Sequence, residues 1–255
     1  MFPLLLAGET GKGNVLDILH ARMLSDSAGK RIDSLGSAKE MGKACSLSEE
    51  VKNEAGILLS CGVLAFQRAA EKEYGEADSL YNRVLKVLRG TDLSEERKKE
   101  YVWRISDMLA FAYLETGNYT GALRYYRIAL DNFNPAFGDT LYEAYAYNRM
   151  GMAYHRDGEY KRAEEYYRKA LKVAGKGEMV ARIYNNLGML YYDRINYSKA
   201  LEYLRKAERV LKESVGDKAK QLAYVYGNMA DVYEAKGDST KAKEYREKAR
   251  RIGQQ

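Results

Sequence analysis

The stretch that looks most like a chemical site lies at the start of the chain, where MFPLLLAGETGKGN joins an apolar run to glycines and a lysine. A strand, a glycine-rich loop with a lysine and a helix make up a phosphate-binding loop. That loop requires four residues between its first glycine and the Gly-Lys pair, and then a serine or threonine. Here only two residues separate Gly8 from Gly11, and Gly13 follows Lys12 where the magnesium-binding hydroxyl belongs. The spacing therefore argues against nucleotide binding.

Histidine and cysteine, which often carry catalysis or bind metals, are scarce in this sequence. His20 and His155 are the only histidines, which excludes a histidine-rich metal site. Cys45 and Cys61 match no zinc spacing, and each lies in a helical pattern where we expect a free cysteine to pack as a small hydrophobic side chain. His155 has no serine or cysteine partner at a helical spacing, and the acidic residues are scattered. We therefore expect no catalytic residue, no metal and no cofactor, so the protein is not expected to be an enzyme.

The composition indicates a helical protein that we expect in the cytoplasm. Only two of the 255 residues are proline, and helix-favouring residues such as alanine, leucine, lysine and glutamate are abundant. No apolar run reaches the ~20 residues that a membrane span needs. The short apolar start of the chain is not preceded by the basic residues of a secretory signal.

Charges of both signs are mixed along the chain. There are 42 basic and 36 acidic residues, which gives a net charge of +6. This excess is compatible with an acidic partner but does not require one. No recognition-helix turn and no aromatic-basic RNA motif is apparent, so the sequence gives little support to nucleic-acid binding.

An internal repeat is the strongest signal in the sequence. Five stretches share an aromatic, a large apolar residue, a small residue and a tyrosine, then a turn, and then an alanine, a bulky residue and a second alanine. In the third copy these are Tyr147, Met150, Gly151, Tyr154, Ala163, Tyr167 and Ala170. The small residues of successive copies are 45, 41, 37 and 42 positions apart, at Ala65, Ala110, Gly151, Gly188 and Ala230.

The spacing within each copy predicts a pair of packed helices. Steps of three and four residues place the shared side chains on one helical face. Gly151 and Gly188 are expected to let the second helix of the pair approach closely. We expect glycines such as Gly117 and Gly158 to end the first helices in a left-handed conformation, with Asn196 in that role in the fourth copy. Each hairpin leaves apolar residues on both flanks, so it must stack on its neighbours.

This skeleton resembles the tetratricopeptide repeat (TPR) family over residues 58–252, with tyrosine in place of the family's tryptophan in three copies. The long repeats and the Asn-Asn-Leu-Gly sequence at 185–188 are similar to kinesin light chain repeats. The resemblance implies an all-α fold, a right-handed superhelical solenoid of antiparallel helix hairpins. It would hold about five repeats plus an N-terminal helical hairpin.

We divide the chain into three parts. These are a flexible lead-in, an N-terminal helical hairpin that is either a degenerate repeat or a cap, and the repeat solenoid with a C-terminal capping helix, at residues 1–13, 14–56 and 57–255. Asn14 can cap the first helix of the N-terminal hairpin.

Two further helix ends can be predicted. Asp92 and Glu95 form a capping-box pattern, which predicts a helix from there to about Thr116. The last helix carries charges such as Lys243 and Arg250 on its outer face, as a solubilising cap requires. That basic patch could instead bind nucleic acid or acidic lipid.

In such a solenoid the first helices of the repeats line a concave face. We expect the positions on these helices that face away from the second helices to form a peptide-binding groove. They are Arg104, Asp107, Phe111, Tyr145, Asn148, Arg149, Met152, His155, Arg182, Asn185, Asn186, Met189, Tyr192 and Asn228, with Tyr224 beside them. Asparagine can bond both groups of a peptide backbone, and arginine can hold a carboxylate. The resemblance implies that the four asparagines contact the backbone of a bound peptide.

The sequence therefore predicts a non-enzymatic interaction module or scaffold that binds a peptide or protein tail. An alternative is the regulatory or sensor portion of a signalling ATPase or transcription regulator system, because such repeats also follow nucleotide-binding domains. Self-association through an exposed end of the solenoid is a further alternative.

Overall fold

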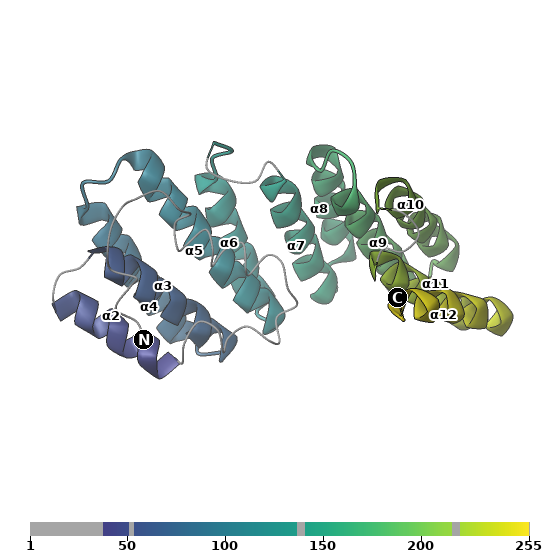
Figure 1. The fold of residues 1–255 in the computed structure, drawn as a ribbon, viewed down its shortest axis with the longest axis horizontal. Helices are drawn as coiled ribbons and strands as arrows, with labels where there is room; N and C mark the ends of the chain where they lie inside the picture. Colours follow the sequence, from purple (N-terminus) through teal and green to yellow (C-terminus); the bar gives the residue numbers. More distant parts are fainter. Residues whose placement is uncertain (1–37, 51–53, 137–140, 216–219, 255) are drawn as a thin grey trace. The chain divides into compact units, whose positions relative to one another are not determined.

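The computed structural model describes residues 38–50, 54–136, 141–215 and 220–254. All regular structure in these ranges is helical, in eleven helices (Figure 1). The chain divides into two compact units, with the boundary between residues 138 and 139. The lead-in and the helix expected after Asn14 lie outside the described residues. None of the helices that the structure describes is long and apolar enough to cross a membrane.

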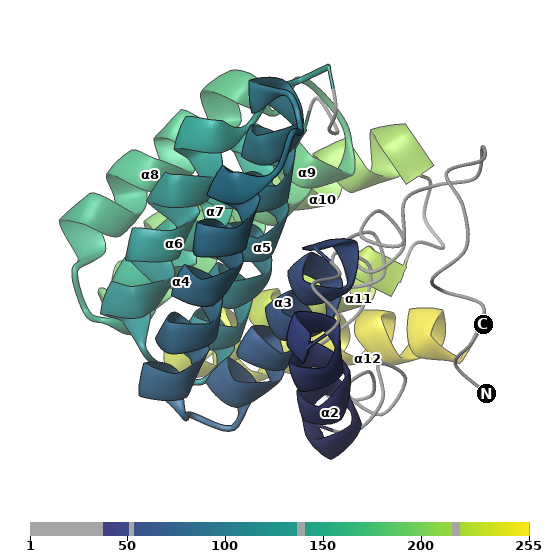
Figure 2. The same cartoon turned by 90° about the vertical axis from the view of Figure 1, so that its left-hand side faces the viewer.

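The first unit is built from two helix hairpins and one preceding helix. Its helices are α2 (Ala38–Glu50), α3 (Glu54–Ala70), α4 (Tyr74–Gly90), α5 (Glu95–Glu115) and α6 (Tyr119–Asn132). Helix α3 pairs with α4 and α5 pairs with α6, while contacts between α3 and α5 stack the two hairpins. Helix α2 packs beside α3 (Figure 2).

The second unit consists of three hairpins. Its helices are α7 (Tyr142–Arg156), α8 (Tyr160–Val173), α9 (Glu178–Asp193), α10 (Tyr197–Val215), α11 (Lys220–Ala235) and α12 (Ser239–Gly253). Each odd-numbered helix pairs with the next, and the hairpins stack because α8 packs on α9 and α10 on α11. The predicted all-α fold of stacked helix hairpins is confirmed.

Small residues allow the two helices of a hairpin to touch. A Cβ atom added to Gly151 of α7 would lie 2.6 Å from the ring of Tyr167 on α8. A Cβ atom on Gly188 of α9 would lie 2.7 Å from Cγ of Leu204 on α10. The close approach predicted at both glycines is therefore confirmed, because no larger residue fits without displacing a neighbour.

The turns within the hairpins share one backbone conformation. Gly117, Gly158 and Gly237 have positive φ angles of 86°, 80° and 82°, as expected. In the fourth copy the prediction was wrong, since Ile195 and not Asn196 takes the left-handed position, with a φ of 59°. Asn196 instead uses its side-chain oxygen to accept a hydrogen bond from the backbone N–H of Lys199 at 3.2 Å. The competing demand of the next helix for an N-cap explains the difference.

Helix α5 begins later than its sequence pattern predicts. The capping residue is Ser94, whose side-chain oxygen accepts a hydrogen bond from the backbone N–H of Arg97 at 3.4 Å. The helix then runs from Glu95 to Glu115, so the expected start at Asp92 was wrong. Serine is as good an N-cap as aspartate, and only the path of the chain decides between them.

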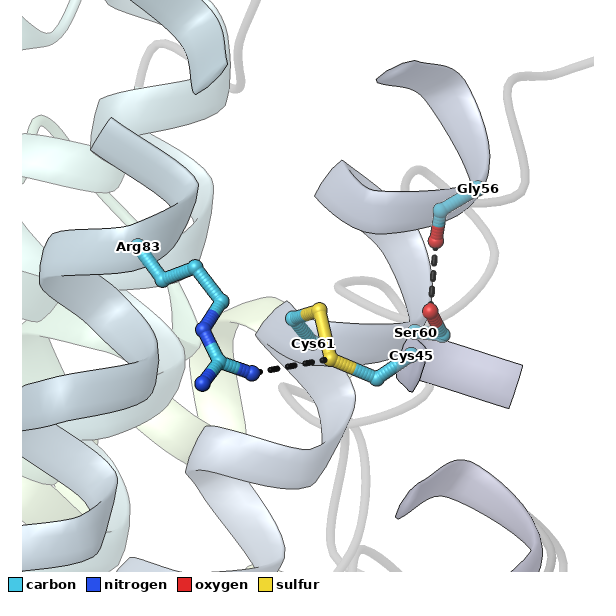
Figure 3. The surroundings of a disulfide bond; sticks show 5 residues. All are labelled: Cys45, Gly56, Ser60, Cys61 and Arg83. Carbon is cyan, nitrogen blue, oxygen red and sulfur yellow. Dashed lines mark hydrogen bonds between the residues drawn. A yellow bond between two sulfur atoms is a disulfide. The ribbon is translucent and has the colours of Figure 1, made fainter. Parts of the chain in front are cut away.

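The two cysteines are joined, which corrects the expectation that they are free. Cys45 of α2 and Cys61 of α3 form a disulfide, with their Cα atoms 5.0 Å apart (Figure 3). Nη1 of Arg83 on α4 lies 3.9 Å from Sγ of Cys45. Both cysteines are almost fully buried, as expected. The pairing depends on how α2 packs on α3, which periodicity alone does not reveal.

Candidate functional site

Four predicted groove residues form hydrogen-bonded pairs across the first helices of the second unit. Helix α7 packs on α9, and α9 packs on α11. Nδ2 of Asn186 on α9 donates a hydrogen bond of 2.9 Å to Oδ1 of Asn148 on α7. Nδ2 of Asn228 on α11 donates one of 2.7 Å to Oδ1 of Asn185 on α9. We call these two pairs the asparagine ladder.

The asparagine ladder retains hydrogen-bonding capacity. An asparagine side chain has two N–H donors and an oxygen with two lone pairs, and each bond between two amides uses one donor and one lone pair. Asn148 is buried, whereas Asn185, Asn186 and Asn228 are partly exposed. The ladder therefore fixes the register of three helices and still presents amide groups that a ligand can reach.

Aromatic and basic side chains accompany the ladder on the same helices. The guanidinium carbon of Arg182 on α9 lies 5.7 Å from the ring centroid of Tyr145 on α7. The side chain of Arg182 is exposed, and Tyr224 of α11 is 76% exposed. Nε2 of Gln221 donates a hydrogen bond of 3.1 Å to Oε2 of Glu178, which joins α11 to α9. A basic group and a large exposed ring are thus available to a ligand on this face.

A polar pair joins α7 to α9 at their C-terminal ends. Nε2 of His155 lies 2.8 Å from Oδ2 of Asp193. The His155 ring also lies edge-on to Tyr160 of α8, with the ring centroids 5.8 Å apart. Within the described residues, no group of three or more His, Cys, Asp or Glu side chains could hold a metal ion.

The same helix ends line a half-open pocket with a volume of about 400 Å³, which we call the Tyr167 pocket. Its lining comes from α7, α8, α9 and the turn between α7 and α8. The residues are Met152, His155, Arg156, Gly158, Tyr160, Tyr167, Asn186, Met189 and Asp193. Asn186 belongs to both this pocket and the asparagine ladder, so the two features adjoin.

Tyr167 is the most deeply buried polar side chain of this pocket. It is 0% exposed, and its hydroxyl has no hydrogen-bond partner among the residues that the structure describes. Burial raises the pKa of the hydroxyl well above its ordinary value, while Arg156 lowers it and Asp193 raises it further. The hydroxyl is therefore neutral across physiological pH and can act as donor or acceptor.

The predicted residues of the first unit lie elsewhere and are mostly buried. Arg104 and Asp107 of α5 are only 5% and 3% exposed. Nη2 of Arg104 donates a hydrogen bond of 2.9 Å to Glu100, and its guanidinium lies 4.7 Å from the Trp103 ring centroid. Phe111 is half-buried on the same helix. The guanidinium of Arg104 therefore contacts side chains of its own helix and is too buried to hold a ligand on the surface.

Two further predicted residues lie on the helices of the candidate face. Arg149 is half-buried on α7. The ring of Tyr192 on α9 lies 5.9 Å from the ring of Tyr197, measured between centroids, and is half-buried.

Five of the nine residues that line the Tyr167 pocket were not predicted as site residues, and one of them, Gly158, was predicted only as a turn residue. Tyr160 and Tyr167 belong to the repeat's packing pattern, which conceals a role in a cavity. Arg156 and Asp193 end their helices at equivalent positions, 37 residues apart, as Gly151 and Gly188 are. If α7 and α9 are superposed by this 37-residue period, Asp193 takes the position of Arg156, so the sequence could have predicted that Asp193 lies near the end of α7.

The stacked hairpins and their first-helix face define a helical repeat protein. The sequence matches the tetratricopeptide repeat family over residues 104–176 and 179–255. The chain therefore belongs to the tetratricopeptide repeat family, as the resemblance implied. A search of curated proteins finds no match.

Solved structures with the same fold come from several proteins. BtubC (BKLC) from P. vanneervenii is 24% identical, with 88% of this chain and 91% of that chain covered and a TM-score of 0.62. A putative kinesin light chain of Podosopora anserina with nearly identical TPR-like repeats is 18% identical, with 77% and 94% covered and a TM-score of 0.55. The Rap conjugation gene regulator of plasmid pLS20, in complex with the Phr* peptide, is 18% identical, with 94% and 62% covered and a TM-score of 0.57. At these identities the likeness extends to the fold alone.

Proposed function

We propose that the protein is a non-enzymatic interaction module that holds an extended peptide or protein tail on the first-helix face of its second unit. The asparagine ladder carries this proposal, because partly exposed amides on adjacent helices match the alternating donors and acceptors of a peptide backbone. The Rap regulator of plasmid pLS20, which has this fold, is in complex with the Phr* peptide. That complex supports a peptide as the ligand class.

The charged groups of the face favour acidic residues in the ligand. Arg182 is exposed beside the ring of Tyr145, and a guanidinium can hold a carboxylate through two parallel hydrogen bonds. A short peptide buries little area, so we expect a dissociation constant of about 1 μM or weaker. Exposed Tyr224 on the neighbouring helix supplies apolar area for a side chain.

The residues of the face support a binding role over a catalytic one. His155 and Asp193 could together act as a general base. The nine residues that line the adjoining Tyr167 pocket include no serine, threonine or cysteine that such a base could activate. The proposal therefore assigns His155 to binding.

A second candidate is the peptide-sensing portion of a regulatory protein. The Rap conjugation gene regulator favours it, since 94% of this chain is covered in that comparison. Both candidates require peptide binding on the same face, so one experiment tests their common step.

A selection from a random-peptide display library on the purified protein tests the proposal. Selected peptides should carry Asp or Glu, and Arg182→Glu should weaken their binding at least about tenfold, through loss of a charge-assisted pair and new repulsion. Binding is measured by fluorescence anisotropy with the labelled peptide, and folding by circular dichroism.

Arg209→Glu is the matched control. Arg209 is exposed on α10, a second helix, so the same charge reversal there should change the dissociation constant less than about twofold. The proposal is wrong if no peptide is enriched, or if Arg182→Glu and Arg209→Glu behave alike.

A further inference from the structure

The lining of the Tyr167 pocket indicates which chemical group would fit in it. Its walls are apolar where Met152 and Met189 line it, and aromatic where Tyr160 lines it. Methionine side chains adapt to the shape of a ring and make favourable sulfur–aromatic contacts. Its volume of about 400 Å³ exceeds that of one aromatic side chain. This part of the lining favours a flat aromatic ring.

Tyr167 is the lining residue that could form a new hydrogen bond with a ligand. The ring of Tyr167 packs over Gly151, which leaves no room for a side chain there. Its hydroxyl is buried and has no hydrogen-bond partner in the described part of the chain, and Arg156 and Asp193 lie near enough to act on its pKa. A buried hydroxyl that makes no hydrogen bond is costly, so a ligand that supplies one gains affinity.

The charges at the pocket balance one another. The lining holds one arginine and one aspartate, and Asp193 is already bound to His155. A charged ligand group would meet an opposite and a like charge together, and it would lose its hydration near the buried hydroxyl. The balance therefore favours a ligand group without charge.

We propose that the Tyr167 pocket is a specificity pocket for a phenol, the side chain of a tyrosine, whose hydroxyl bonds that of Tyr167 while Met152, Met189 and Tyr160 hold its ring. The inference rests on the proposed function, because Asn186 joins the pocket to the asparagine ladder. A peptide whose backbone bonds the ladder would then place one tyrosine side chain in the pocket.

Titration with p-cresol, the isolated side chain of tyrosine, tests the pocket without any peptide. The protein is labelled with ¹³C at its methionine methyl groups, so Met152 and Met189 report from the pocket walls. We expect both methyl resonances to shift, with a dissociation constant of about millimolar for so small a ligand. Toluene, which lacks the hydroxyl, should bind about fivefold more weakly, and so should the anion p-toluate.

Two variants and one control complete the test. Tyr167→Phe should bind p-cresol no better than toluene while it keeps the ring packing over Gly151. Met189→Trp should fill the pocket and abolish the shift of the Met152 methyl group with either ligand. Tyr203→Phe removes the hydroxyl of a buried tyrosine on α10 that does not line the pocket, and p-cresol binding should persist.

The proposal is overturned if p-cresol shifts neither methionine, if toluene and p-toluate bind as well as p-cresol, or if Tyr167→Phe leaves the preference for p-cresol intact. Should Tyr167→Phe fail to fold, the ligand comparison and Met189→Trp still decide. Binding of p-cresol without any enriched peptide would support the pocket and refute the proposed function. Peptide binding without p-cresol binding would refute the pocket alone.

Discussion

Asp78 of α4 is the centre of a polar cluster in the first unit. Its Oδ1 accepts hydrogen bonds from the hydroxyls of Tyr113 at 2.5 Å and Tyr125 at 2.7 Å. Its Oδ2 forms an ion pair of 2.7 Å with Nη2 of Arg124. These contacts connect α4 to both helices of the next hairpin. One carboxylate thus joins consecutive repeats.

The cluster favours the charged form of this carboxylate. Burial by itself raises the pKa of Asp78. Hydrogen bonds from Tyr113, Arg124 and Tyr125 together lower it by more than burial raises it, so the pKa lies below its usual value. A carboxyl whose pKa is lower in the folded state stabilises that state above its unfolded pKa. This stabilisation is lost as the pH falls through the folded pKa.

We therefore predict that Asp78→Asn destabilises the protein by about 2 kcal/mol at pH 7, because three donors lose a charged acceptor. The difference from wild type should begin to shrink below about pH 4, where the carboxyl of the unfolded chain becomes protonated, and it should be lost as the pH falls through the lower pKa of the folded state. Urea denaturation at pH 7 and at pH 3 measures both values. A difference that stays constant with pH would contradict the argument.

At the scale of the elements, the turn between α9 and α10 differs from the other turns of its unit. Gly158 and Gly237 have positive φ angles in the turns before and after it, whereas Ile195 has a φ of 59°. A β-branched residue is strained in the left-handed region because its Cβ crowds the backbone. Its side chain is 73% exposed, so burial contributes little to offset that strain.

Ile195→Gly should therefore raise the free energy of unfolding by about 1 kcal/mol, because glycine adopts this conformation without strain. Ile195→Ala is the control, because it also removes the exposed side chain but keeps a Cβ atom, and its gain should be clearly smaller. Thermal unfolding followed by circular dichroism gives both values. Equal effects of the two substitutions would show that the exposed side chain, and not the backbone, is responsible.

At the scale of the whole molecule, the disulfide that stabilises the fold and the candidate binding site lie in different units. The disulfide between Cys45 and Cys61 lies in the first unit, whereas the asparagine ladder and the Tyr167 pocket lie in the second. In repeat proteins each hairpin is stabilised mainly by its neighbours. A change at the disulfide should therefore remain local.

We predict that replacing both cysteines by serine loosens α2 without affecting the candidate site. A disulfide that closes a loop of this length, with its cysteines 16 positions apart, contributes about 3 kcal/mol. Hydrogen exchange measured by mass spectrometry should become faster in residues 38–50 and stay unchanged in α9 and α11. Faster exchange throughout the second unit would contradict independent repeats.

The local features of the fold could be predicted from the sequence because they repeat at short spacing. The small residues at Gly151 and Gly188 and the left-handed turns at Gly117 and Gly158 follow from steric limits within one hairpin. The assignment of groove residues to first helices rests on the same short period. The left-handed conformation of Ile195 was not predicted, because asparagine, its neighbour at 196, adopts that conformation more readily than isoleucine.

The sequence by itself determined the repeat, the hairpins and the helices that present the candidate face, since helical periodicity and turn chemistry act between residues close in the chain. Only the tertiary structure decided which side chains meet between helices. The pairs Asn148–Asn186 and His155–Asp193 each join residues 38 positions apart, and the cysteines pair across two packed helices. Such contacts depend on the offset at which helices stack, which is set by the packing of whole side-chain surfaces.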